Sequence, residues 1–190
     1  MILLTNNRNS LPLYNWLIKR TNTTIYSEKI SVPIIHKINP DLVVSYNYNY
    51  IVKPDVIALL PKKIVNLHIS LLPWNRGTSP NFWSFIDDTP KGVTIHQIDS
   101  GLDTGAVIVQ KQMFFDENIE TLASSYQKLQ DEIQELFKIN FDKIFNKTYK
   151  AEPSKEKGSF HRASDIQKLI GGFPPYHIKI SELKSWINGR

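Results

Sequence analysis

The sequence predicts an α/β fold, with an open, mostly parallel twisted sheet, helices on both faces, and a β-hairpin-like antiparallel addition. Short β-like and helical stretches alternate over the first 150 residues, a pattern typical of a largely parallel sheet. The alternating segments 92–98 and 106–115 are joined by a short loop, which predicts antiparallel neighbours. A long helix follows, because apolar residues recur every three or four positions from Leu122 to Ile144.

The individual elements follow from local patterns. A helix is expected from Ser10 to about Lys19, because a capping serine followed closely by Pro12 is typical of a helix start. Further helices are expected to begin at Pro54 and at the cap Thr78–Pro80. The expected strands are short β-prone runs, at 2–4, 23–26, 41–46, 64–68, 92–98 and 106–115.

After Lys150 the sequence becomes polar and loop-like. We therefore expect one domain over residues 1–150 and an extension, residues 151–190, packed on the same domain. Within the extension, Ser164 and Gln167 predict a capping box for a short helix, and a final short helix is expected over 181–187.

Composition narrows the function classes. The chain has 190 residues, enough for one domain with a real core, and no apolar run approaches the roughly 20 residues that span a bilayer. It contains no Cys and its start does not resemble a signal peptide, so we expect a cytoplasmic protein. The net charge of +5 favours an anionic small molecule, and without a concentrated basic run no nucleic acid is expected.

Several common site motifs are missing from the sequence. No G-x-G-x-x-G follows the first strand, and no Walker A lysine loop is present. No set of residues has the ligand spacing typical of zinc, so no metal is expected. Without a Cys, the sequence offers no thiol nucleophile.

Three polar residues form the strongest candidate site. Asn66 and His68 are two residues apart on an apolar strand, so both side chains point to the same side of the sheet. Asp103 follows on a loop flanked by glycines. Ligands of open α/β sheets bind beyond the carboxyl ends of strands, and we expect Asn66, His68 and the segments 46–50 and 99–103 to meet there.

This set suits the transfer of an acyl-like group. An amide and an imidazole can donate hydrogen bonds to a developing oxyanion, a histidine can carry a proton near neutral pH, and a carboxylate can orient the ring. Each residue alone also has a structural reading, with His68 as a satisfied strand-end residue and Asn66 and Asp103 as turn formers. We interpret His96 as a packed or edge residue of its strand and His161 as part of a solvated tail.

Three segments resemble formyltransferases that use 10-formyltetrahydrofolate: Asn66–Gly77, Lys91–His96 and Leu102–Gly105. The elements N-x-H, S-L-L-P, R-G, G-V-T-I and D-T-G occur in this order, and together they are highly specific. The resemblance is strong over residues 40–115 and implies a Rossmann-like formyltransferase fold with its catalytic domain at 1–150. It also makes Asn66, His68 and Asp103 the catalytic set. The chain departs from many members at Ile69 and Ala106, neither of which touches that set.

The resemblance also implies binding residues. The co-substrate would be 10-formyltetrahydrofolate, and its pterin would lie against two loops. The predicted cofactor-binding residues are Tyr48, Tyr50, Ile51, Val52, Gln97, Ile98, Asp99 and Asp103. The predicted substrate-binding residues are Ser70, Trp74, Asn75 and Arg76.

The acceptor amine is less well determined. Residues 151–190 are too few for the tRNA-binding barrel of methionyl-tRNA formyltransferases, and Thr5–Ser10 lacks the glycine-rich loop of glycinamide ribonucleotide transformylases. The segment 74–84 resembles small sugar N-formyltransferases and also the formylation domains of nonribosomal peptide synthetases. A free-standing chain of 190 residues favours the sugar role, so we expect a nucleotide-linked amino sugar as the acceptor. Two alternatives stay open: formylation of an aminoacyl group on a carrier protein or tRNA, and a non-catalytic folate- or nucleotide-binding module. We expect no membrane partner, and the oligomeric state is left open between monomer and homodimer.

Overall fold

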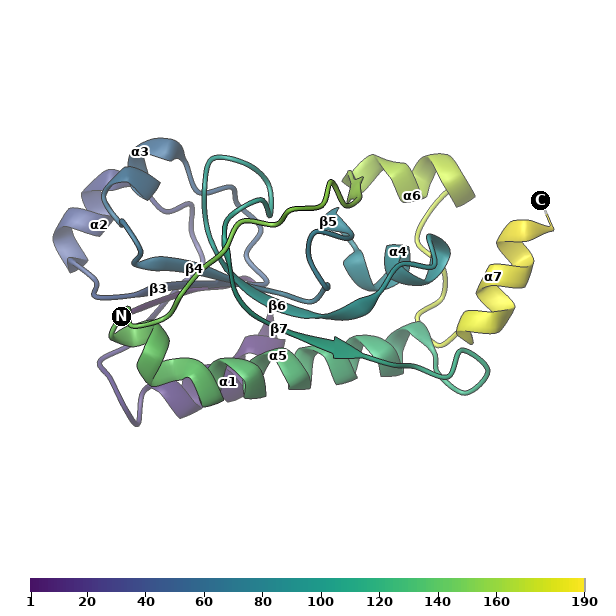
Figure 1. Cartoon of the computed structure of the whole chain (residues 1–190), viewed down its shortest axis with the longest axis horizontal. Helices are drawn as coiled ribbons and strands as arrows, with labels where there is room; N and C mark the ends of the chain where they lie inside the picture. The colour runs from purple at the N-terminus through teal and green to yellow at the C-terminus, as the bar shows by residue number, and fades with distance from the viewer. Residues whose placement is uncertain (190) are drawn as a thin grey trace.

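The computed structural model describes residues 1–189 and contains a six-stranded sheet with helices on both faces (Figure 1). The strand order is β2-β1-β3-β4-β6-β7. The strands are β1 (Ile2–Leu4), β2 (Thr24–Tyr26), β3 (Val43–Tyr46), β4 (Ile64–His68), β6 (Lys91–Gln97) and β7 (Val107–Met113). The first four are parallel, whereas β6 runs antiparallel to both β4 and β7. The predicted fold class is confirmed, including its antiparallel hairpin.

The helices α1 (Leu11–Leu17) and α5 (Leu122–Phe145) cover one face of the sheet, and α2 (Val32–Ile38) and α3 (Pro54–Ala58) lie on the other (Figure 1). A short 3-10 helix, Arg8–Ser10, leads into α1. Sequence reasoning missed α2, although Ser31 caps it and a proline lies in its first turn, which is the same signal that predicted α1.

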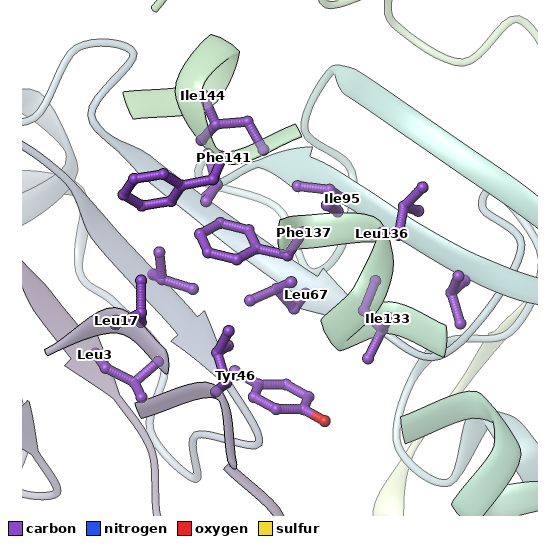
Figure 2. Packing of buried hydrophobic residues seen from close by; sticks show 14 of the residues in the cluster. Leu3, Leu17, Tyr46, Leu67, Ile95, Ile133, Leu136, Phe137, Phe141 and Ile144 are labelled. Carbon is purple, nitrogen blue, oxygen red and sulfur yellow. The ribbon is translucent and has the colours of Figure 1, made fainter. Parts of the chain in front are cut away.

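The larger core lies between the sheet and α5. Figure 2 shows Ile133, Phe137 and Phe141 of α5 facing Leu67 of β4. Phe137 is fully buried, and the ring centroids of Phe137 and Phe141 are 5.9 Å apart in an edge-to-face contact. The predicted apolar stripe therefore forms the main core, between α5 and the sheet.

The opposite face of the sheet is apolar under α2 and α3 and polar toward β6. Ile2, Leu4, Val43 and Ile64 are buried on this face with residues of α2 and α3. Asn66 and His68 continue the same side of β4, and His96 of β6 lies directly opposite Asn66. Two loops, residues 70–77 and 98–105, reach these polar side chains: the Asn75 carbonyl lies 3.4 Å from His68 Nε2, and Asp103 accepts Asn66 Nδ2 at 3.2 Å. The candidate site thus begins where the apolar face under α2 and α3 ends.

The C-terminal residues contact the rest of the fold at several points. The two-residue strand β8 (Phe160–His161) pairs with β5 (Arg76–Gly77), and the His161 ring stacks on Trp83 with centroids 3.9 Å apart. His161 Nε2 lies 2.7 Å from an Asp87 carboxylate oxygen. His161 is therefore part of a packed contact, and its interpretation as a solvated tail residue is wrong.

The last helices build a third apolar cluster. The helices are α4 (Pro80–Ile86), α6 (Ala163–Ile170) and α7 (Ile180–Asn188), and the cluster joins them to the start of α5. The capping box predicted at Ser164 and Gln167 is wrong, because α6 begins at Ala163 and its N-cap is Arg162, two residues before Ser164. There Arg162 donates its N–H to Asp165 at 2.7 Å.

Within residues 1–189, no helix has both the length and the apolar character to cross a membrane.

The α5 core gives a direct stability prediction. Phe137→Ala removes a fully buried ring, so we expect the free energy of unfolding to fall by about 3–5 kcal/mol. Urea denaturation measures this as a lower midpoint with an unchanged slope. Phe114→Ala is the matched control because Phe114 is 85% exposed, and it should change stability by about 0.5 kcal/mol or less. Equal losses for the two variants would contradict the packing described here.

Candidate active site

A cavity of about 680 Å³ lies on the polar part of the sheet face. This volume is within the range of small-molecule sites. Four segments line it: Asn47–Val52 after β3, Asn66–Ile69 at the end of β4, Gly77–Phe82 leading into α4, and the loop after β6 from Ile98 to Asp103. Five further residues complete the lining: Ser45, His96, Tyr126, Phe173 and Tyr176. The cavity therefore gathers residues that are far apart in the sequence.

Asp103 is the centre of the polar contacts in this cavity. Its Oδ2 accepts the backbone N–H of Gly77 at 2.9 Å, and its Oδ1 accepts Asn66 Nδ2 at 3.2 Å. His68 Nδ1 lies 3.8 Å from Oδ2, and His96 Nε2 lies 3.6 Å from Oδ1. The structure thus brings together the three predicted catalytic residues and adds His96 to them.

Backbone geometry holds Asp103 in place. Asp103 has a φ of +53°, and within its loop the Asp99 carboxylate accepts the Gly101 N–H at 3.0 Å and the Thr104 hydroxyl at 2.7 Å. A Cβ at Gly105 would lie 1.7 Å from the carbonyl oxygen of Gln97, so only glycine fits there. The D-T-G element of the sequence therefore has a structural reason, which is the close return of this loop to β6.

His96 orders the Asn66 amide. His96 Nδ1 lies 2.7 Å from the carbonyl oxygen of Gln97, and a carbonyl only accepts, so Nδ1 carries a hydrogen and donates it. The lone pair on Nε2 then accepts Asn66 Nδ2 at 3.2 Å. Both amide N–H bonds of Asn66 are used by His96 and Asp103, and no hydrogen bond within residues 1–189 reaches Asn66 Oδ1.

Sequence reasoning did not assign His96 to the site. His96 is 2% exposed on a central strand, so the interpretation as a packed residue is right and the edge position is wrong. Its link to the site depends on the pairing of Asn66 with His96 across β4 and β6. That register is a property of the sheet, and no local sequence pattern shows it.

Burial favours the neutral form of His68. Its side chain is 9% exposed, and burial lowers the pKa of the ring below its ordinary value although the Asp103 charge acts in the opposite direction. His68 Nε2 lies 3.4 Å from the carbonyl oxygen of Asn75, which places the ring hydrogen on Nε2. At neutral pH the Nδ1 lone pair therefore faces Asp103.

Asp103 stays ionised. Burial alone would raise the pKa of its carboxyl, but the charges of His68 and His96 in acid and the Gly77 N–H outweigh burial. The net result is a pKa well below the usual range. At neutral pH the Asp103 carboxylate charge thus lies beside the neutral ring of His68.

The predicted pterin-binding residues lie on the cavity with one exception. Tyr48, Tyr50, Ile51, Val52, Ile98, Asp99 and Asp103 all line it. Gln97 does not, because its side chain donates to the Tyr149 hydroxyl at 3.0 Å. Ile51 is 74% exposed and Leu102 is 44% exposed, so these loops present apolar side chains that the core does not use.

None of the four predicted substrate-binding residues lines the cavity. Ser70 donates to the carbonyl of Trp74, Asn75 is buried and donates to Thr89 at 2.7 Å, and Arg76 donates to the carbonyl of Lys157 at 3.2 Å. These side chains hold the loop that delivers Gly77 to Asp103. We therefore correct the assignment: the lining residues on this side are Gly77, Thr78, Ser79, Pro80, Asn81 and Phe82.

The site segments meet in one cavity as expected, but the loop 98–103 starts from the opposite edge of the sheet. Because β6 is antiparallel to β4, Ile98 lies beside the beginning of β4, where it donates to the Ile64 carbonyl at 3.3 Å. The loop then returns across the face of the sheet to bring Asp103 to Asn66.

Within residues 1–189, no three His, Cys, Asp or Glu side chains are grouped to hold a metal ion.

Comparison with known proteins places this site in a family. The model of the formyl transferase family matches residues 17–138, which include Asn66, His68, His96 and Asp103. The chain belongs to the formyl transferase family. The family assignment agrees with the predicted fold and with the resemblance of the motifs around Asn66 and Asp103.

One solved member is similar over nearly its whole length. The formyltransferase PseJ from Anoxybacillus kamchatkensis, solved in complex with UDP-4,6-dideoxy-4-formamido-L-AltNAc and tetrahydrofolate, is 37% identical. Its TM-score is 0.85, and the match covers 96% of each chain. The similarity therefore includes the C-terminal residues that line part of the cavity.

Two curated members match over shorter segments. The dTDP-4-amino-4,6-dideoxyglucose formyltransferase of Mycobacterium tuberculosis is 36% identical over 107 residues, 56% of this chain and 45% of that protein. The methionyl-tRNA formyltransferase of Ehrlichia ruminantium is 38% identical over 98 residues, 50% of this chain and 32% of that protein. The match thus spans less than half the length of these two relatives.

The Asp103 contacts predict a pH-dependent contribution to stability. The pKa of Asp103 is lower in the folded than in the unfolded protein, so its ionised form stabilises the fold above about pH 4, and this contribution is lost as the pH falls. We expect Asp103→Asn to lower the free energy of unfolding by about 1–3 kcal/mol at pH 7. Urea denaturation from pH 7 to pH 3 measures the difference from wild type, which should shrink in acid.

Asp142→Asn is the matched control, since Asp142 is an exposed carboxylate on α5 whose side chain makes no hydrogen bond or ion pair within residues 1–189. A difference between wild type and Asp103→Asn that stays constant down to pH 3 would contradict the stabilising role of the Asp103 charge.

Proposed function

We propose that this protein transfers a formyl group from 10-formyltetrahydrofolate to the primary amine of a nucleotide-linked amino sugar. The observation that carries the proposal is the arrangement of Asn66, His68 and Asp103 around one cavity. The similarity to PseJ, whose structure contains a formamido sugar nucleotide and tetrahydrofolate, supports the choice of donor and acceptor.

The loops Tyr48–Val52 and Ile98–Asp103 suit the pterin of the donor. They present exposed apolar side chains at Ile51 and Leu102, and a flat heterocycle can bury these against its faces. Tyr48 anchors its loop, because its hydroxyl accepts the Ile30 N–H at 2.8 Å. The donor would thus meet a loop that is already held in position.

The reaction requires one new bond and one broken bond. The acceptor nitrogen attacks the formyl carbon, negative charge develops on the formyl oxygen, and the bond between that carbon and N10 of the folate then breaks. The acceptor nitrogen loses one proton, and N10 gains one, so the folate leaves as neutral tetrahydrofolate. The site must therefore supply a hydrogen-bond donor for the oxygen and a base for the proton.

Asn66 is the donor for the oxygen in this proposal. One N–H of its amide donates to the charged Asp103 carboxylate. The other donates to the ring nitrogen of His96, and this hydrogen bond is the weaker of the two because its acceptor carries no negative charge. The formyl oxygen replaces His96 as the acceptor of that second N–H. Asp103 meanwhile keeps the amide oriented through the first.

His68 is the base. Its Nδ1 and Asp103 Oδ2 are 3.8 Å apart, too far for a direct hydrogen bond but close enough to share one donor. The attacking amine, or a water bound to it, is that donor. The neutral ring takes the proton, and the Asp103 carboxylate stabilises the imidazolium that forms.

The function is tested with 10-formyltetrahydrofolate and a panel of amines: UDP- and dTDP-linked 4-amino sugars, a free amino sugar, and methionyl-tRNA. We expect release of tetrahydrofolate with a nucleotide-linked sugar only. Asn66→Ala, His68→Ala and Asp103→Ala should each reduce kcat/KM by roughly 10²-fold or more. Asn140→Ala, on the far side of the sheet on α5, is the control and should leave the rate unchanged.

If methionyl-tRNA is formylated and none of the nucleotide-linked sugars is, the proposed acceptor is wrong. Wild-type rates in folded His68→Ala and Asp103→Ala variants would contradict the proposed chemistry.

The lowered pKa of His68 predicts the pH profile. Because the neutral ring is the active form, kcat/KM should be constant from pH 8 to pH 7 and fall in acid with a midpoint below 6.5. Initial rates in buffers of constant ionic strength measure the profile. A midpoint above 6.5, or no acid decline before the protein unfolds, would contradict His68 as the base.

A further inference from the structure

One wall of the cavity is built from aromatic rings of three separate segments. Phe82 comes from α4, Tyr126 from α5, and Phe173 and Tyr176 from the connection between α6 and α7. The rings of Phe173 and Tyr176 are stacked, with centroids 5.4 Å apart and planes 24° apart. Phe82 contacts Phe173 at 5.9 Å, and Tyr126 contacts Tyr176 edge-on at 5.9 Å.

The packing of the core does not account for all of these rings. Phe82 is 1% exposed and belongs to the third apolar cluster, but Phe173 is 49% exposed and Tyr176 is 43% exposed. The backbone beneath them is nevertheless fixed, because Ala123 at the start of α5 donates to the Tyr176 carbonyl at 2.8 Å. Two accessible ring faces are thus held in a defined place on the cavity wall.

The charges of the cavity restrict what this wall can bind. Among the described residues that line the cavity, none is Lys or Arg, and the charged ones are Asp99 and Asp103. The wall therefore offers no cation to hold a phosphate, and its affinity for a nucleotide would come from ring faces. Stacking on aromatic side chains suits every base, since each has a flat π face.

We propose that Phe173 and Tyr176 bind the base of the acceptor nucleotide by stacking, and that this aromatic wall is the nucleoside subsite of the cavity. The proposal rests on the proposed function, since it assigns the acceptor of that reaction to one wall. The tetrahydrofolate lies against the other loops, Tyr48–Val52 and Ile98–Asp103. Asp103 lies between the two, bound to Gly77 of the α4 side and carried by the folate-side loop.

The test measures binding of UDP and dTDP by calorimetry in the absence of folate. We expect Phe173→Ala and Tyr176→Ala each to weaken binding of the tighter nucleotide about 5- to 100-fold, the range of base–aromatic stacking. Tyr176→Phe keeps the ring and should retain nearly wild-type affinity. Phe114→Ala is the matched control, an exposed phenylalanine outside the cavity lining.

Tetrahydrofolate binding, measured in the same variants, separates this inference from the proposed function. Unchanged folate affinity with weakened nucleotide binding supports the aromatic wall as the nucleoside subsite. Unchanged nucleotide affinity overturns it, whether or not the variants lose thermal stability, and so does a loss of folate affinity with nucleotide binding intact. If the wild type formylates a nucleotide sugar in either of the last two cases, the proposed function stands and only the subsite is wrong. A wild type that binds neither UDP nor dTDP overturns both.

Discussion

The site depends on the hydrogen bonds that the Asp103 carboxylate accepts from Asn66 and Gly77. One oxygen accepts the Gly77 N–H and the other accepts the Asn66 amide, so a single charge joins β4, the turn before α4 and the loop after β6. Both histidines of the site lie within 4 Å of it. A buried charge is costly unless it is hydrogen-bonded, and these contacts satisfy Asp103 while they orient the groups that face the cavity.

The residues after 150 hold the loop that carries Gly77 in position. A Cβ at Gly77 would lie 2.2 Å from the carbonyl oxygen of His161, so β8 fixes the position from which the Gly77 N–H reaches Asp103. Ser159 adds a second link by donating to Asn75 at 3.2 Å. Residues after 150 therefore support the loop of the site as well as contributing Phe173 and Tyr176 to its wall.

Much of this arrangement is legible in the sequence. Alternation on β4 places Asn66 and His68 on one side, and the helical stripe of α5 predicts the core that lies behind them. His96 and the aromatic wall are not legible, because they depend on the register of β6 and on how residues 171–176 return to α5. The R-G element does mark the site, but through Gly77 and not through the predicted Arg76 side chain. Gly77 donates its N–H to Asp103, whereas Arg76 holds the loop through the Lys157 carbonyl.

In the proposed reaction, the Asp103-centred site moves a formyl group directly from folate to a nucleotide-sugar amine. The most direct measurement uses 10-formyltetrahydrofolate labelled in the formyl group, followed by chromatography of protein, folate and sugar nucleotide after single turnovers. Wild type should transfer the label to the sugar nucleotide with none bound to protein. Asp103→Asn should bind both substrates yet leave the label on the folate. Label on the protein, or wild-type transfer by Asp103→Asn, would contradict this account.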